Sequence, residues 1–317
     1  MANSHTYTTS GVFIDPSTDP GFKILFGREA SADILIDLLN TILGAADDPI
    51  TSITYLDKEK IKESPGERSM AFDIHCQTNK GERFIVEMQN ISQEWFVERC
   101  LMYGARAITA QSISGKWDYF YEPVISIAFT NFTIPQFEGQ IIADGSIIDK
   151  YSGNPLTDRL RLIFIQLPQF KILNPEECNT DIEKWIYTII NMKNMENIPF
   201  AANKPIFKRV ESLAKMENMS PEDRFEYEQQ LKAYWDYYST MKFARTQGLA
   251  EGRAEGRAEG RAEGRAEGRA EGRAEGRAEG EKKKAMEIAK NLKYATQLSD
   301  QEIADISQLP LELVSQL

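Results

Sequence analysis

A tandem repeat near the carboxyl-terminal end constrains the fold of this chain more than any other feature. From Ala250 the unit Ala-Glu-Gly-Arg recurs without error through Arg277. A period of four advances about 400° around an α-helix, so each position drifts by about 40° per unit. Like charges recur at i,i+4, and each glycine costs about 1 kcal/mol relative to alanine. The pattern favours a solvated, partly helical spacer, and the alternative is a long self-associating helix.

The repeat also divides the chain into regions. Ahead of it, Ser220 is a good N-cap and Pro221 suits the first position of a helix that runs to Gln247. After it, Ser299 caps one of several short helices. Together these helices form a unit that is too small for a DNA-binding domain and that suits docking or dimerisation. We therefore expect a core in 1–170, a helical region in 171–249, the repeat in 250–281 and a short helical tail in 282–317.

Composition excludes several classes of protein. Hydrophobic residues make up 42% of the 317 residues, which argues against wholesale disorder. No apolar run approaches the roughly 20 residues of a membrane helix, and the first residues lack the pattern of a secretion signal, so we expect a cytoplasmic protein with no membrane partner. Three scattered cysteines suit a reducing compartment, and two histidines argue against a histidine-based zinc site. The net charge of -11 disfavours DNA binding, although a local basic surface or a bound cation can override it.

The first 170 residues have an α/β pattern. Helices are expected over 22–26, from Ser31 to Gly44, and from Ser92 through Ala110. Strands are expected over 50–56, 69–78, 82–90, 124–133 and 160–167. This order predicts a mixed β-sheet flanked by helices. It is not a Rossmann fold, because no glycine-rich phosphate loop follows a strand.

Two of these strands, AFDIHCQ and RFIVEMQ, carry the strongest local signal. Alternation puts Phe72, Ile74 and Cys76 on one face of the first strand and Asp73 and His75 on the other. The connection Asn79-Lys80-Gly81 suits a hairpin with glycine in the left-handed conformation. A hairpin centred on Lys80 places Asp73 directly opposite Glu87, with Cβ atoms about 4.5–5.5 Å apart.

Two opposed carboxylates repel each other, so something should compensate them. A Mg²⁺ ion is the natural candidate, because it takes one or two carboxylates and keeps several waters. The backbone carbonyl of Met88 could supply another oxygen, and the Gln89 amide could orient a water. The chemistry of such a site is metal-assisted hydrolysis of a phosphodiester. Two other interpretations stay open: a solvated strand face, and a buried carboxyl pair that shares one proton. His75 is more often a supporting or core histidine than a base.

Asp73 followed by Glu87-Met88-Gln89 resembles the PD-(D/E)XK nuclease signature, with glutamine in place of the usual lysine. The flanking sequence is similar to that of the Rpn family of recombination-promoting nucleases. It includes DPGFKILFG (19–27), LLNTILG, FDIHCQTNKGERFIVEMQ, RCLMY with Arg99 and Tyr103, RLIFIQLPQF, and the later Trp185. The resemblance covers nearly the whole chain. It implies a restriction-endonuclease-like mixed sheet followed by an α-helical carboxyl-terminal region.

The resemblance also implies a set of site residues. Asp73 and Glu87 match the metal-binding acids, and Gln89 matches the third catalytic position. Gln89 lacks the positive charge of lysine, so the resemblance implies slow turnover or help from another basic group, and Lys80 is too far away. Glu29, or less closely Asp33, matches a first-helix acid.

Further residues of the resembling segments have two interpretations each. Lys23, which with Asp19 belongs to the opening segment, could contact phosphate or simply lie near a helix start. Arg99 and Tyr103 share one side of a helix. They could hold a phosphate or brace the acids, or they could form an ordinary ion pair and packing contact.

Two functions from different classes follow from the resemblance. The first is a metal-dependent endodeoxyribonuclease that uses Mg²⁺ or another divalent cation and acts on DNA in recombination or mobile-element biology. The second is a catalytically idle nuclease-fold module that binds DNA or protein. Double-strand cleavage needs two active sites, so we also expect a homo-oligomer formed through the carboxyl-terminal helical region.

Overall fold

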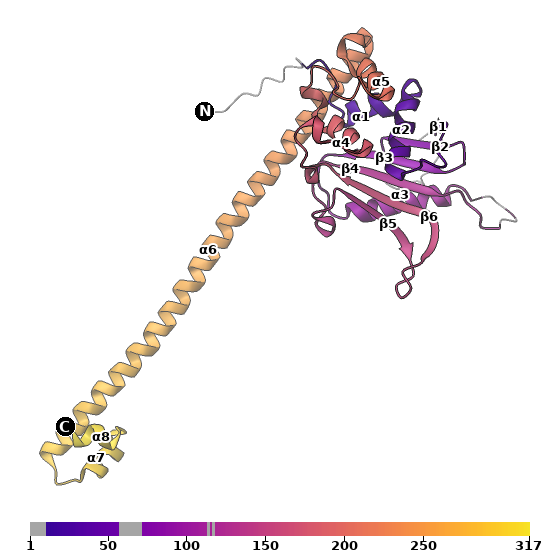
Figure 1. Cartoon of the computed structure of the whole chain (residues 1–317). Coiled ribbons are helices and arrows are strands. Elements are labelled where there is room, and N and C mark those ends of the chain that lie inside the picture. Colours follow the sequence, from indigo (N-terminus) through magenta and orange to yellow (C-terminus); the bar gives the residue numbers. More distant parts are fainter. Residues whose placement is uncertain (1–10, 57–71, 113–114, 116–117) are drawn as a thin grey trace. The chain divides into compact units, whose positions relative to one another are not determined.

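The computed structural model describes residues 11–56, 72–112, 115 and 118–317. The chain divides into two compact units, Met1–Ser239 and Thr240–Leu317, and each is described by itself. The first unit contains a mixed sheet of six strands in the order β1-β2-β3-β4-β6-β5 (Figure 1). The strands are β1 (Ile53–Tyr55), β2 (Ile74–Thr78), β3 (Arg83–Gln89), β4 (Val124–Thr130), β5 (Ile142–Ile148) and β6 (Pro155–Gln166).

The central strands of the sheet are parallel. Strand β4 pairs in parallel with β3 and with β6, and the other neighbours are antiparallel. The mixed sheet expected from the sequence is therefore confirmed. Strand β5 was not expected, because all of its residues except Ala143 are exposed and it contains Asp144 and Gly145. An exposed edge strand of this composition lacks the alternation that identifies strands.

The β2–β3 hairpin has the predicted register. Ile74 pairs with Val86 and Gln77 with Arg83, and Gly81 adopts a φ of 92° in the turn. Strand β2 starts only at Ile74, because the chain bends at Asp73. The expectation that Phe72 shares a face with Ile74 and Cys76 is wrong for this reason. Past the bend Phe72 packs against Tyr103 on the opposite side of the sheet, with ring centroids 5.9 Å apart.

Helices cover both faces of the sheet (Figure 1). Four of them pack with Val86 and Phe129 into the main core: α1 (Asp19–Phe26), α2 (Ala32–Leu43), α4 (Asp181–Asn191) and α5 (Pro205–Ala214). Helix α3 (Phe96–Thr109) covers the other face, where Phe96 and Cys100 pack against Phe164. The helices that follow the sheet in sequence thus share its core, since Trp185 of α4 is completely buried there.

Local sequence explains where three of these helices begin and end. Helix α1 begins at Asp19, earlier than expected, because the Thr18 side chain accepts a hydrogen bond from the Gly21 N–H and a proline occupies the first turn. Helix α2 ends at Gly44, as predicted, with a φ of 64°. The expectation that Ser92 caps α3 is wrong, since the helix starts only at Phe96, after Trp95 in the left-handed conformation.

Helix α6 (Pro221–Ala295) contains the whole repeat. Every residue from Ala250 to Gly280 is helical and exposed. The tract is therefore solvated, as expected of a spacer, but it is fully helical where the sequence favoured partial helicity. Self-association of this helix stays a prediction.

The last residues form a small helical cluster in the second unit. Helices α7 (Asp300–Ser307) and α8 (Leu311–Ser315) pack on the end of α6 around Ala289, Ile303 and Val314. Ser299 caps α7, as predicted, in a reciprocal capping box with Glu302. Within the residues that the structure describes, no helix combines the length and apolar character of a membrane span.

Candidate active site

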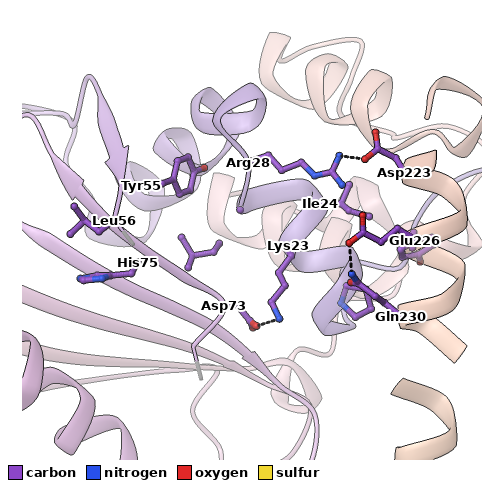
Figure 2. Close-up of a pocket in the computed structure, with 14 residues that line it drawn as sticks. Lys23, Ile24, Arg28, Tyr55, Leu56, Asp73, His75, Asp223, Glu226 and Gln230 are labelled. Carbon is purple, nitrogen blue, oxygen red and sulfur yellow. Dashed lines mark hydrogen bonds and ion pairs between the residues drawn. The ribbon is translucent and has the colours of Figure 1, made fainter. Parts of the chain in front are cut away.

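Asp73 lies at the bend directly before β2, the first strand of the hairpin. Its Oδ2 accepts a hydrogen bond from the backbone N–H of Met88 at 2.8 Å. Its Oδ1 lies 3.0 Å from Nζ of Lys23 on α1, as the dashed line in Figure 2 shows. Only 9% of the Asp73 side chain is exposed, whereas 44% of Lys23 is. The acid is therefore fixed by the backbone of β3 and neutralised by a half-exposed cation.

Glu87 is the second acid and is buried in β3. Its Oε1 lies 3.7 Å from Nη2 of Arg99 and accepts a hydrogen bond from the Cys100 thiol at 3.4 Å, both on α3. Burial raises the pKa of Glu87, the positive charge of Arg99 opposes this rise, and the negative charge of Asp73 adds to it. The two acids thus lie within electrostatic reach, although each is paired with a cation from a different helix.

Gln89 connects the strand to the same arginine. Its Oε1 accepts a hydrogen bond from Nη2 of Arg99 at 2.8 Å, and its Nε2 donates to the Ile91 carbonyl at 2.9 Å. The Arg99 guanidinium also lies 5.7 Å from the centroid of the Tyr103 ring. Arg99 therefore brings a full positive charge between Glu87 and Gln89, and the structure joins these predicted residues in one network.

A third acid, Asp19, reaches the site from the first turn of α1. Its Oδ1 accepts a hydrogen bond from Nδ2 of Asn90 at 3.1 Å. Burial raises the pKa of Asp19, and the charge of Asp73 adds to the rise. The first-helix acid near Asp73 is thus Asp19. Its place in the DPGFK opening was the available signal, but only the packing of α1 on the sheet reveals its position.

The two acids that the resemblance suggested for this role lie elsewhere. Glu29 is exposed in a short 3-10 helix, Glu29–Ser31, and does not line the cavity beside Asp73. Asp33 is paired with Arg209 of α5 at 3.4 Å. Both residues lie beyond Gly27, where α1 ends, in the helices that follow it. The assignment of Glu29 as a metal ligand therefore gains no support from its position.

A cavity of about 340 Å³, here called the first cavity, opens beside Asp73 (Figure 2). Its wall includes Lys23 of α1 and Arg28, which lies just after that helix, and Arg28 lies 3.1 Å from Asp223 at the start of α6. His75 forms part of the wall from β2. The wall also contains Asp223 and Glu226, so three acids and two cations border a space that is large enough to admit a polar ligand.

His75 itself is 4% exposed and packs edge-on against Phe72, with centroids 5.4 Å apart. Burial lowers its pKa to about 4, and the positive charge of Arg83 contributes to the lowering. Among the described residues, neither ring nitrogen has a hydrogen-bond partner. At neutral pH the imidazole is therefore uncharged, as expected of a core histidine.

The family model of the PD-(D/E)XK nuclease family transposases matches residues 16–244, which include every site residue described above. The chain belongs to this family. Neither the curated proteins nor the solved structures gave a match. Family membership confirms the fold and the resemblance noted from the sequence, and it indicates a nuclease-like function.

In this member of the PD-(D/E)XK family, the signature strand carries a glutamine that is bonded to an arginine. The Nη2 atom of Arg99 is shared between Gln89 and Glu87, and Nη1 donates to Gln93. The positive charge that the signature lysine would bring to β3 thus comes from α3, across one face of the sheet. Sequence reasoning had placed Arg99 on the correct helix but could not assign its partners.

The acids fit a divalent cation as a partial ligand set. PD-(D/E)XK nucleases generally use divalent metal ions, and the carboxylates of Asp73 and Glu87 are the hard oxygen donors that Mg²⁺ prefers. Within the part of the chain that the structure describes, no three acids, cysteines or histidines are grouped closely enough to hold an ion. The fit is therefore to an ion held by one or two carboxylates, with water and substrate phosphate completing its shell.

Proposed function

We propose that the chain is a Mg²⁺-dependent DNA endonuclease that hydrolyses phosphodiester bonds in recombination or the movement of mobile elements. The observation that carries the proposal is the network of two acids, Asp73 and Glu87, with Gln89 and Arg99. Family membership supports nuclease chemistry, and the assignment of metal, substrate and residue roles is our own.

In this proposal Asp73 and Glu87 hold the metal ion, which when bound would polarise the phosphate and lower the pKa of a water. Lys23 can leave Asp73 for a phosphate oxygen, because its side chain is half-exposed and flexible. Arg99 holds Glu87 and Gln89 in position and offsets the negative charge of Glu87. Burial raises the pKa of Glu87, and a cation binds the charged form of this acid, so metal binding competes with protonation there and activity should rise with pH.

A second function has its own supporting observation. In the structure both acids already have cationic partners, Lys23 and Arg99, and the signature lysine is replaced by Gln89. A protein with its acids neutralised in this way could keep the nuclease scaffold as a catalytically idle module that binds DNA or protein. Cytoplasmic location and a homo-oligomer formed through the carboxyl-terminal helices remain further parts of our proposal.

A nicking assay on supercoiled plasmid separates the two functions. We expect Mg²⁺-dependent nicking by the full chain and its loss in Asp73→Asn and in Glu87→Gln, because each substitution removes a charged ligand while keeping the side-chain shape. Glu98→Gln is the matched control, since Glu98 is exposed on the same helix as Arg99. Unchanged nicking by either site variant would refute the metal assignment. DNA binding without any nicking would favour the idle module.

A further inference from the structure

A second cavity of about 340 Å³ lies in the first unit and is unlike the one beside Asp73. Its wall combines three aromatic side chains of α6, namely Tyr234, Trp235 and Tyr238, with Asn90 and Asn131 from the ends of β3 and β4. The volume is at the lower end of the range for small-ligand sites, about 300–1,000 Å³. The cavity therefore has the size and the lining of a site for a flat, polar-edged ligand.

The aromatic side chains form a compact group. Tyr234 and Tyr238, one turn apart on α6, have ring planes within 18° of each other and centroids 6.4 Å apart. Trp235 meets both tyrosines edge-on, at 5.1 Å and 5.8 Å. All three rings are only partly buried. Partly buried aromatic faces on a cavity wall are the usual platform for stacking of nucleic-acid bases.

The asparagines connect this cavity to the candidate active site. Asn90 directly follows Gln89, and its Nδ2 donates to Asp19, whose charge interacts with that of Asp73. Asn131 donates to Asn90 and, at 3.0 Å, to the Ser17 carbonyl. A ligand held between the aromatic group and these amides would thus lie beside the end of β3, the strand that carries Glu87 and Gln89.

Cations border the same cavity. Lys193 lines it and lies 3.0 Å from Asp15. Exposed Lys171 donates to the carbonyl of Pro168, a lining residue, at 2.6 Å. Lysines at the border of an aromatic pocket suit the phosphates on either side of a stacked base.

We propose that the second cavity binds an unpaired nucleobase of the DNA strand whose phosphodiester lies at Asp73, so that the substrate is single-stranded or locally unpaired DNA. Aromatic rings stack on any base, and the amides of Asn90 and Asn131 can bond to base edges that are free of Watson–Crick pairing. A base inside a duplex is stacked and paired and cannot enter such a pocket. The inference rests on the proposed nuclease function, whose substrate class it narrows.

The test is binding of a fluorescently labelled 12-nucleotide single strand of DNA, compared with the blunt-ended duplex that the same strand forms with its complement. Binding is measured by anisotropy without divalent metal, so that no cleavage occurs. We expect the full chain to prefer the single strand, and Tyr238→Leu to weaken this binding about tenfold or more. Tyr238→Phe keeps the ring and should bind as the parent does. Tyr237→Leu is the matched control, because Tyr237 is 56% exposed on the same helix and does not line the cavity.

The outcomes separate this inference from the proposed function. Equal affinity of Tyr238→Leu and its parent for the single strand, or an equal loss in Tyr237→Leu, would overturn the base pocket even if Asp73→Asn abolishes nicking. Equal affinity for the blunt-ended duplex and the single strand would overturn it as well. Binding that depends on Tyr238 in a chain that never nicks DNA would support the pocket and refute the nuclease. Circular dichroism of each variant identifies any loss that comes from misfolding; if Tyr238→Leu misfolds, Tyr234→Leu takes its place with the same expected loss, because Tyr234 lines the same cavity.

Discussion

The ammonium group of Lys23 lies 3.0 Å from the Asp73 carboxylate and occupies the oxygen that a metal ion would need. A cation in this position has two consequences. It reduces the repulsion between Asp73 and the other two acids, and it competes with any divalent ion for the same carboxylate. The Lys23–Asp73 ion pair therefore couples the position of α1, which carries Lys23, to metal binding at Asp73.

Removal of this competitor should strengthen metal binding. We expect Lys23→Met to lower the Mg²⁺ concentration needed for half of the thermal stabilisation by about two- to fivefold, which is the scale of a half-exposed ion pair. The measurement is the melting temperature against Mg²⁺ at constant ionic strength. Lys80→Met is the control, because Lys80 pairs with Asp48 at the tip of the hairpin, 2.8 Å apart. An unchanged or higher midpoint in Lys23→Met would show that the two cations do not compete.

Arg99 should be needed for stability as well as for activity. Arg99→Leu leaves the Glu87 carboxylate buried without its cation, and we expect a loss of about 1–3 kcal/mol in the free energy of unfolding at pH 8. The loss should be smaller at pH 5 than at pH 8, because burial raises the pKa of Glu87 and protonation removes the unpaired charge. Urea unfolding at the two pH values measures it. In the double variant with Glu87→Gln the buried charge is absent, so equal destabilisation of the single and double variants would contradict this account.

His75 should make the fold sensitive to acid. Burial lowers its pKa from the ordinary 6.5 to about 4 in the folded chain, so the unfolded chain binds a proton first as the pH falls. The stabilisation is complete above pH 6.5 and should be lost progressively down to about pH 4, by about 3 kcal/mol in total. Urea unfolding of the wild type and of His75→Phe across this range tests the difference in slope. His5→Phe is the control, as the only other histidine of the sequence.

We expect that Gly21 of α1 cannot be replaced by a residue with a side chain without loss of stability. A Cβ atom at this position would overlap the backbone carbonyl of Asp15, so Gly21→Ala must shift the helix that carries Asp19 and Lys23. We expect a loss of about 1–3 kcal/mol in stability together with weaker nicking. Gly252→Ala in the repeat meets nothing within 4 Å and should leave the unfolding midpoint unchanged or raise it. Equal midpoints for Gly21→Ala and wild type would contradict the close packing.

The sequence predicted the parts of the fold that depend on local patterns. Alternation and the turn at Gly81 were enough for the register of the β2–β3 hairpin, because these signals act over a few residues. Strand β5 was not predicted, because an exposed edge strand of this composition carries no such pattern. The start of α3 was misplaced because Ser92 is a good cap by composition, whereas the chain continues to Trp95 before it turns.

The candidate site was predictable only as a set of residue types. The alternation of β3 identified Glu87 and Gln89, but their partner Arg99 lies on a helix whose rotation against the sheet is set by the packing of Phe96 and Cys100. Asp19 was named only as part of a motif, because its hydrogen bond to Asn90 spans 71 residues of sequence. Contacts of this kind depend on tertiary packing, which no local pattern encodes.

The shared guanidinium of Arg99 changes how the departure from the nuclease signature should be understood. A lysine introduced at position 89 would bring its ammonium against a guanidinium that already occupies the space, and the two like charges would repel. Reversion to the common signature would therefore harm this protein unless the arginine were replaced in the same step. In this family member the residue at position 89 has to be interpreted together with its partner on α3, because the two side chains form one hydrogen-bonded unit.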